Sequence, residues 1–532
     1  MAATQTLISR RIENKHPQDR FLDPAPLFVT AALTAVAILI HGFHPYAEDG
    51  GIYLPGILKL VHPALYPTWT GFVTAQTRFS LFAPAIAGIV RLTGVSVMAC
   101  VFCIYVLSIW GTLYAAWLIA WRCLKGSEAQ YGAVAVLSLC MTAPAAGTSL
   151  LLVDPYVTAR SISTPLGMLS IVGALDLISQ FKQSGHVRMR SIGLTGASLV
   201  VAAIMHPLMA SYAVCCVVLL FCASVSSIRL RTLTLALSGL FALIFATLVH
   251  LLAPTQPQGY AAVAHTRYYW FISAWHWYEI VGLIAPLFLL LAIARTSTIL
   301  NESGRWLAYM GIFAGIIGLE ISLIFAHQSA NNYFVAMLQP LRIFHMIYIV
   351  MILLTGAVLA GAFLERDPVR WTATFVVLGS LMFFVQIQTF PHSAHIELPW
   401  RSQANDWERG FDWIRNNTPH DACFALDAHY IESPGEDAQN FRAIAERSSI
   451  PDYTKDGGIA AIDATLTLEW IAGETIQANL ATLSDDQRRD RLARAHVQWL
   501  VLPGASFTTL DCPYQNDAMK VCRSSGAANS SP

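Results

Sequence analysis

Residues 24–51 read PAPLFVTAALTAVAILIHGFHPYAEDGG, an apolar run that ends in two adjacent carboxylates, Glu48 and Asp49. A membrane helix needs about 20 apolar residues, and residues 24–42 meet that length. The polar segment 1–23 precedes this run and no small-residue cleavage site follows it, so we expect the first span to remain as an anchor. Charges beside lipid are costly, so a carboxylate pair directly after a span calls for a functional explanation.

The composition extends this membrane pattern over most of the chain. Of the 532 residues, 55% are hydrophobic and 12% are charged, whereas an ordinary soluble domain has about 25% charged residues. The formal net charge is zero, which argues against a nucleic-acid partner. Apolar runs fill residues 24–390, while residues 391–532 are rich in Asp, Glu and Arg. We therefore predict a polytopic α-helical membrane domain followed by one C-terminal domain.

The apolar runs predict about eleven spans. They cover residues 24–42, 96–121, 129–148, 163–180, 191–206, 208–227, 232–253, 276–295, 306–326, 342–363 and 371–390. If the N-terminal segment 1–23 is cytoplasmic, every inside loop carries at least two basic residues, as the positive-inside rule requires. The short outside loops carry fewer, chiefly Arg160 and Arg267.

This topology requires that residues 79–94 do not cross the membrane. The segment is short and contains Pro84, so we predict an interfacial helix on the outer leaflet. It then belongs to one long external loop, 43–95, together with a short helix near 52–61.

The tail, 391–532, is predicted to be an exported α/β domain. Its patterns indicate helices at 403–417, 437–447 and 484–495, the last opening with a capping box at Ser484, and strands at 422–426 and 497–502. A disulfide between Cys512 and Cys522 would agree with export, although sequence spacing does not establish it.

The first candidate site is Glu48 and Asp49 with the following Gly50-Gly51. Either carboxylate could remove a proton from an acceptor hydroxyl or hold a divalent metal ion on a phosphate, and the glycines allow close approach. The alternative is structural, with Asp49 as the N-cap of the helix near 52–61.

A second candidate lies in the next external loop, in the run Asp154–Pro165. Asp154 and Arg160 either pair with each other or act separately. In the second case Asp154 is a further acid and Arg160 binds phosphate oxygens through its forked guanidinium group.

Two further clusters lie at the predicted outer interface. The first contains His265, Arg267, Trp270 and Trp275. An aromatic interfacial belt explains it, but Trp270 and Trp275 could also stack on a sugar while His265 and Arg267 face a phosphate. The second cluster is centred on Arg342 at the start of a span, where it either reaches a lipid headgroup or holds the phosphate of a bound lipid carrier.

With these residues in place, the chain resembles the GT-C class of membrane glycosyltransferases. The likeness lies in the many spans, the acidic residues in a long first external loop, the interfacial helices of that loop and the exported C-terminal domain. The resemblance implies a polyprenyl-phosphate sugar donor, Asp49 or Glu48 as base or metal ligand, Asp154 as a second-loop acid, and Arg160 or Arg342 as a donor-phosphate ligand. The Glu-Asp-Gly-Gly order differs from the acidic pairs common in characterised members.

The chain is also similar to an uncharacterised family of bacterial multi-pass proteins. That similarity rests on residues 44–53, 154–165, 269–279, 339–342 and 413–421. It implies the bacterial cytoplasmic (inner) membrane as the location but brings no activity.

The resulting function hypothesis is transfer of a sugar from a polyprenyl-phosphate-linked donor to an acceptor at the outer face of that membrane. A transporter or flippase is the main alternative, and Glu320 within a span favours it because a buried carboxylate could relay a proton. A non-catalytic assembly protein is the third. The chain has no Walker loop, G-x-S-x-G or H-E-x-x-H motif, which argues against a nucleotide-driven pump.

Overall fold

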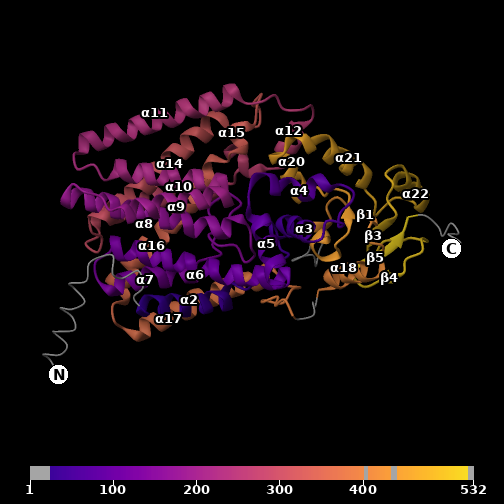
Figure 1. Ribbon diagram of the computed structural model, residues 1–532, viewed down its shortest axis with the longest axis horizontal. Helices are drawn as coiled ribbons and strands as arrows, with labels where there is room; N and C mark the ends of the chain where they lie inside the picture. The colour runs from indigo at the N-terminus through magenta and orange to yellow at the C-terminus, as the bar shows by residue number, and fades with distance from the viewer. Residues whose placement is uncertain (1–23, 401–404, 433–439, 525–532) are drawn as a thin grey trace.

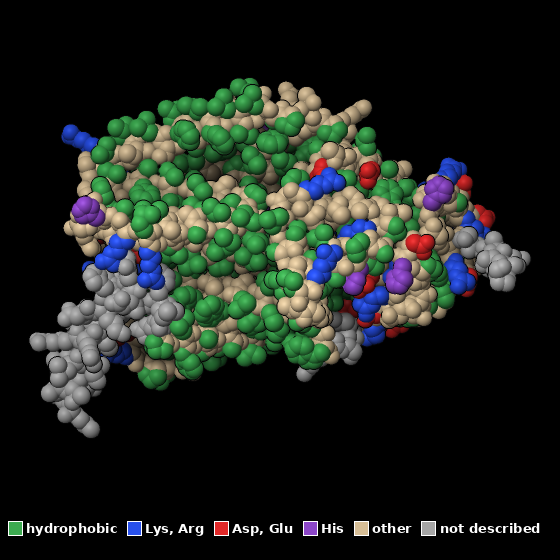
Figure 2. Space-filling view, in the orientation of Figure 1, with side chains coloured by type: hydrophobic (Ala, Val, Ile, Leu, Met, Phe, Trp, Pro, Cys, Tyr) green, Lys and Arg blue, Asp and Glu red, His purple; other side chains and the backbone are tan. Residues whose placement is uncertain are grey.

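The computed structural model describes residues 24–400, 405–432 and 440–524. A bundle of long helices forms one end of the molecule, and a smaller domain with a β-sheet forms the other (Figure 1). Charged side chains of both signs gather on the sheet-containing end, whereas hydrophobic side chains dominate the surface of the bundle (Figure 2). This distribution fits a multi-pass membrane protein with a polar C-terminal domain.

Eight helical segments in the described ranges are long and apolar enough to cross a membrane. They are α2 (Pro24–His41), α6 (Val97–Cys123), α8 (Ala159–Ser184), α11 (Ile228–Leu252), α13 (Trp277–Thr296), α14 (Glu302–Phe325), α17 (Pro368–Thr389) and the composite segment Phe334–Leu364. The composite segment joins α15 (Phe334–Met337), η4 (Pro340–Ile343), α16 (Phe344–Leu359) and η5 (Ala360–Leu364). The predicted hairpin forms α9 (Met189–Met205) and α10 (Pro207–Ala223), each 17 residues long and at the lower limit for a span.

The count of eleven spans is not confirmed, and the predicted span 129–148 shows one reason. Its helix, α7 (Ser127–Leu139), has only 13 residues. Pro144 lacks a backbone N–H and disfavours helix in the residue before it, and the chain continues in irregular form to the start of α8. Irregular backbone at membrane depth must satisfy its hydrogen bonds inside the protein. Here Ala145 N–H donates to the Leu150 carbonyl at 2.9 Å and Leu152 N–H donates to the Ala143 carbonyl at 3.1 Å.

The loop 43–95, which the sequence predicts to be the first external loop, folds into three short helices, α3 (Gly50–Val61), α4 (Thr70–Phe79) and α5 (Phe82–Thr93). At 12 residues, α5 is about 18 Å long, well short of a membrane span. The hydroxyl of Tyr105, near the start of α6, donates to the Gly42 carbonyl at the end of α2 at 2.6 Å. The loop therefore leaves and re-enters the bundle at one end, beside the C-terminal domain (Figure 1).

The C-terminal domain is α/β, as predicted. Its elements are α18 (Asp406–Asn417), β1 (Cys423–Ala425), α19 (Phe441–Ala445), β2 (Ser448–Ser449), α20 (Lys455–Ile462), α21 (Thr467–Gln477), α22 (Asp485–Arg494), β3 (Trp499–Pro503), β4 (Tyr514–Gln515) and β5 (Met519–Arg523). The sheet order is β2-β1-β3-β5-β4, parallel among β2, β1 and β3 and antiparallel elsewhere. The Ser484 capping box is present, and Cys512 and Cys522 form a disulfide. The first part of the helix predicted at 437–447 lies outside the described residues.

This domain is seated on the first external loop and on the short helix α12 (Tyr260–His265). The hydroxyl of Tyr66 donates to the Arg442 carbonyl at 2.8 Å, and the hydroxyl of Tyr260 donates to the Ala461 carbonyl at 2.5 Å. Both tyrosines are almost fully buried, so these contacts combine apolar packing with satisfied polar groups. The docking brings α20 next to the residues that follow the first span.

Candidate active site

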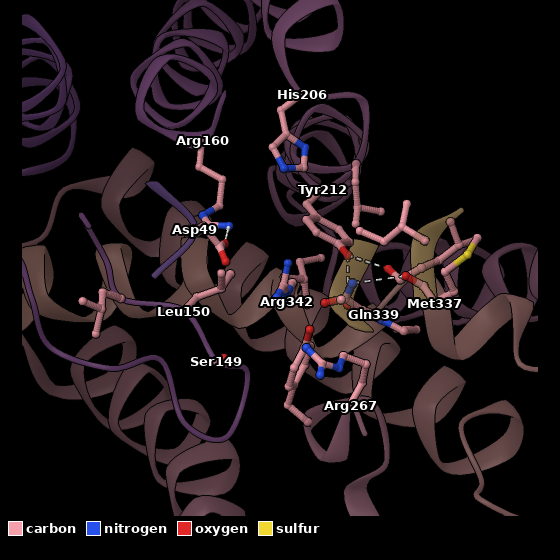
Figure 3. A pocket seen from close by; sticks show the side chains of 18 of the residues that line it. Asp49, Ser149, Leu150, Arg160, His206, Tyr212, Arg267, Met337, Gln339 and Arg342 are labelled. Atoms are coloured by element: carbon pink, nitrogen blue, oxygen red, sulfur yellow. Dashed lines mark hydrogen bonds and ion pairs between the residues drawn. The ribbon is translucent and has the colours of Figure 1, made fainter. Parts of the chain in front are cut away.

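A cavity of about 1610 Å³ lies where the first external loop, the bundle and the C-terminal domain meet. Polar residues from six parts of the chain face it: Glu48, Asp49, Arg160, His206, Arg267, Gln339, Arg342 and Lys455. Figure 3 shows several of these side chains converging on one space from different helices. The size suits a large substrate, because ordinary small-molecule pockets have about 300–1,000 Å³.

Arg160 joins the two predicted acidic loops. Its guanidinium group donates to Asp49 at 2.9 Å and to Asp154 at 2.9 and 3.2 Å. Thr158 caps the start of α8 in a capping box, which fixes Arg160 in the first turn. The predicted pairing of Asp154 with Arg160 is therefore present, but the same cation also binds Asp49. Asp154 is nearly fully buried, whereas the Asp49 side chain is 32% exposed and faces the cavity.

Asp49 has an ionised carboxylate that lines the cavity. Asp49 occupies the N-cap position of α3, as the structural alternative predicted, but its side chain makes no capping hydrogen bond to that helix. Burial alone would raise the pKa of Asp49, but the charges of Arg160, Lys455 and Arg342 outweigh it and lower that pKa to about 2. Asp49 therefore carries its negative charge at any physiological pH.

Glu48 points to a different partner. Its carboxylate pairs with the ammonium group of Lys455, in the first turn of α20. The backbone of Glu48 has a φ of +47°, in the left-handed region that non-glycine residues rarely adopt. This turn lets adjacent carboxylates face opposite ways, Asp49 toward α8 and Glu48 toward the C-terminal domain. Nothing in the sequence around Lys455 had indicated that it belongs to the site.

Arg342 lies across the cavity from Asp49 (Figure 3). Its guanidinium carbon is 5.3 Å from the centre of the Tyr269 ring, in a cation–π contact. Within the described residues it has no carboxylate partner, and its buried Nε makes no hydrogen bond. The preceding turn is fixed by Tyr212, whose hydroxyl donates to the carbonyls of Leu338 and Gln339 at 2.6 and 2.8 Å. Arg342 is therefore a positioned cation that forms no ion pair within the described residues, although its charge acts on Asp49 through space.

Four predicted site residues do not line the cavity: Asp154, which binds Arg160, and His265, Trp270 and Trp275. His265 contacts the Gln328 carbonyl at 3.0 Å and the Tyr333 hydroxyl at 3.2 Å. Trp270 and Trp275 are buried in hydrophobic clusters, at 2% and 8% exposure, and do not line the cavity. The neighbouring residues Tyr268 and Tyr269 line it instead.

Aromatic residues that the sequence did not single out surround the polar groups. They are Tyr53, Tyr156, Tyr212, Tyr278, Tyr348 and Tyr453. Tyrosine offers a flat apolar face and a hydroxyl, which suits contact with a sugar ring. The sequence offered a signal only for some of them: Tyr156 lies in the run Asp154–Pro165, whereas Tyr212 and Tyr348 lie within apolar helices.

One branch of the cavity is apolar and runs between α10, α11 and α14. Its lining includes Cys215, Ala242, Phe245, Ala246, Val249, Ile317 and Ile321. Most of the outward-facing side chains of α11 are exposed hydrophobic residues, as expected for a helix in contact with lipid. The cavity therefore joins a polar site to a branch lined by apolar side chains.

The acidic residues do not fit a divalent metal ion in this arrangement. No group of three or more His, Cys, Asp or Glu in the described ranges is placed to hold a metal. Arg160 occupies the position between Asp49 and Asp154 that a shared cation would take, and Lys455 pairs with Glu48. The chemistry proposed below therefore includes no step through a metal.

Glu320, which supported the transport alternative, lies outside this cavity. It is half-buried on α14, and a Cβ added at Gly239 on α11 would lie 3.7 Å from its carboxylate. The polar groups of the large cavity do not include it.

No family model and no curated protein matches the chain. Among solved structures, it resembles the archaeal oligosaccharyltransferase AglB from Archaeoglobus fulgidus in complex with an inhibitory peptide and a dolichol-phosphate, with 9% identity and a TM-score of 0.47 over 91% of this chain and 70% of that chain. It also resembles the Archaeoglobus fulgidus oligosaccharyltransferase in complex with Zn and sulfate, with 11% identity and a TM-score of 0.44 over 90% and 68%. Both neighbours are glycosyltransferases, the kind of protein that the sequence resembles. With TM-scores below 0.5, these likenesses do not decide what this chain does.

Proposed function

We propose that this protein transfers a sugar from a polyprenyl-phosphate-linked donor to an acceptor hydroxyl at the outer face of the bacterial cytoplasmic membrane. One observation carries the proposal: a single cavity holds an ionised carboxylate, Asp49, opposite a guanidinium group, Arg342, that has no ion-pair partner in the described residues, and it continues into an apolar branch. A lipid phosphate has the matching parts, a hydrocarbon chain and an anion. The disulfide in the C-terminal domain supports an external location for that domain and for the cavity beneath it.

The proposed reaction forms a bond between the acceptor oxygen and the anomeric carbon of the sugar and breaks the bond from that carbon to the donor phosphate. Arg342 binds the phosphate oxygens, where negative charge develops as the bond breaks. Asp49 accepts the acceptor's proton. With a pKa of about 2 it is a weak base, so it takes this proton late, once the hydroxyl oxygen has begun to bond to carbon and has become acidic.

Arg160 acts on the reaction through Asp49. It binds the Asp49 carboxylate at 2.9 Å and is itself anchored by buried Asp154, so the carboxylate has a defined orientation before substrate arrives. Such positioning removes reorganisation from the reaction step. In this assignment Asp154 supports Arg160, and Glu48 attaches the loop to the C-terminal domain.

The test is transfer of radiolabelled sugar from a panel of polyprenyl-phosphate sugars to a membrane lipid extract by the purified full chain. We expect the Asp49→Asn variant to lose about 10²–10⁴-fold in rate, the usual worth of a general base, while it still folds. Glu48→Gln is the matched control because it removes the neighbouring charge, and it should retain transfer. Full activity in Asp49→Asn, with the wild type active, would remove Asp49 from the mechanism.

A further inference from the structure

Arg267 presents a second cation to the same cavity, beneath the C-terminal domain. Its side chain is largely buried, and its Nε donates to the hydroxyl of Thr266 at 2.9 Å. Within the described residues it makes no ion pair. The four acidic residues that line the cavity have other partners: Glu48 pairs with Lys455, Asp49 pairs with Arg160, Glu279 accepts from the backbone N–H of His276, and Glu432 accepts from the hydroxyl of Thr454.

The C-terminal domain is shaped to receive this guanidinium group. Gly457 and Gly458 lie in α20, and a Cβ added at either would approach Arg267 Nη2 at 3.4 Å or Nη1 at 3.1 Å. Glycine is disfavoured within a helix, so two consecutive glycines in an eight-residue helix need a reason. Gly458 leaves space for Arg267 between the two domains, while Gly457 leaves space both for Arg267 and for the indole of Trp470, whose Nε1 would lie 3.2 Å from the added Cβ.

Arg267 and Arg342 share one wall of the cavity. Arg267 directly precedes η2 (Tyr268–Trp270), and Tyr269 of that turn carries the cation–π contact with Arg342. Figure 3 shows both guanidinium groups directed into the same space. Two like charges that line one partly buried cavity repel each other, and an anion bound near both would relieve this repulsion.

We propose that Arg267 and the first turns of α20 form a second anion subsite, specific for a phosphate or phosphate-like group. This inference rests on the proposed function, in which Arg342 takes the donor phosphate. The second anion belongs either to the donor, as the further phosphate of a diphosphate linkage, or to an acidic group on the acceptor. In both cases the subsite exists only when the C-terminal domain is docked, because Gly457 and Gly458 close it.

The experiment measures binding of polyprenyl monophosphate, polyprenyl diphosphate and inorganic phosphate to the full chain in detergent. The variants are Arg267→Gln and Arg342→Gln, with Arg229→Gln as an exposed control at the start of α11. We expect wild type to bind two inorganic phosphates and Arg267→Gln to bind one. If the donor supplies the second anion, the diphosphate binds about tenfold more tightly than the monophosphate in wild type, and Arg267→Gln removes that difference.

If the acceptor supplies the anion, the two lipids bind equally, while the second inorganic phosphate is still lost in Arg267→Gln. One phosphate site in wild type, or two in Arg267→Gln, would overturn the inference. Failure of the proposed function gives a separate result: Arg342→Gln would then leave the binding of polyprenyl monophosphate unchanged.

A glycine variant distinguishes loss of the anion subsite from loss of the fold. In Gly458→Ala the new methyl group crowds Arg267, so binding of the second phosphate should fall several-fold, although alanine favours helix. Gly88→Ala is the matched control, because nothing lies within 4 Å of a Cβ at that helical position. Unchanged phosphate binding in Gly458→Ala would contradict the role given to α20.

Discussion

Two walls of the cavity carry arginine, and they differ in how the charge is balanced. On one wall Arg160 is held by two carboxylates, Asp49 and Asp154, at 2.9 Å each. On the other wall Arg342 and Arg267 have no carboxylate partner within the described residues. A balanced cation contributes to structure and orientation, whereas an unbalanced one is available to a ligand. The comparison separates the positioning residues of this site from its binding residues.

The substitution Arg160→Gln is expected to have the largest effect and tests the role of the arginine that is paired with carboxylates. It leaves two neighbouring carboxylates without a cation, so we expect the free energy of unfolding to fall by about 3–5 kcal/mol. Arg122→Gln is the matched control, because Arg122 is equally buried and pairs with one carboxylate, Asp176, at 2.7 Å. Thermal unfolding in detergent measures both variants. An equal or smaller loss in Arg160→Gln would show that Asp49 and Asp154 do not depend on it.

On the other wall, Arg342→Gln should leave stability nearly unchanged and weaken ligand binding. The loss of charge-assisted hydrogen bonds to a phosphate should cost about 1.5–3 kcal/mol, or roughly 10–100-fold in affinity for polyprenyl monophosphate. Equilibrium binding and thermal unfolding on the same preparation give both quantities. If Arg342→Gln instead unfolds the protein as Arg160→Gln should, the distinction between the two walls disappears.

The smallest expected effect is a change in pH dependence when Lys455 becomes glutamine. Burial raises the pKa of Asp49, and Lys455 is one of the charges that lower it to about 2, so its removal should raise that pKa toward the ordinary 3.8. The base must be ionised, so activity is kept above this pKa and lost as the pH falls through it. The acid limb of kcat/KM should therefore move to higher pH in Lys455→Gln, while Lys59→Gln, on the far end of α3, should leave it in place. If the acid limb of kcat/KM does not move in Lys455→Gln, then Lys455 does not influence the pKa of Asp49.

Features that depend on neighbouring residues were predictable from the sequence. The first span, the capping box at Ser484 and the pairing of Asp154 with Arg160 each need only a few consecutive residues. The short length of α7 was not predicted, because residues 129–148 are apolar enough to span but contain Pro144. Residues 140–158 are mostly buried as irregular chain, because they hydrogen-bond to one another and several of them line the cavity.

The choice between aromatic residues was also beyond the sequence. Trp270 and Tyr269 are adjacent and equally suited to a sugar, but a 3₁₀ turn directs one into a hydrophobic cluster and the other to the cavity. A rotation of about 120° per residue in such a turn points neighbours in different directions, so Trp270 is buried in the cluster while Tyr269 only packs against its edge and also lines the cavity. No composition or spacing rule could have assigned the two faces.

The sequence by itself determined that this is a multi-span helical protein with a polar α/β tail, and it marked Asp49, Arg160 and Arg342 as candidates, because hydrophobic length and charge placement are local properties. Only the tertiary structure decided which charges meet. Arg160 reaches Asp49 across 111 residues and Lys455 reaches Glu48 across 407. Contacts at such separations depend on how helices and domains pack, and that packing divides two adjacent carboxylates between the reaction site and the domain junction.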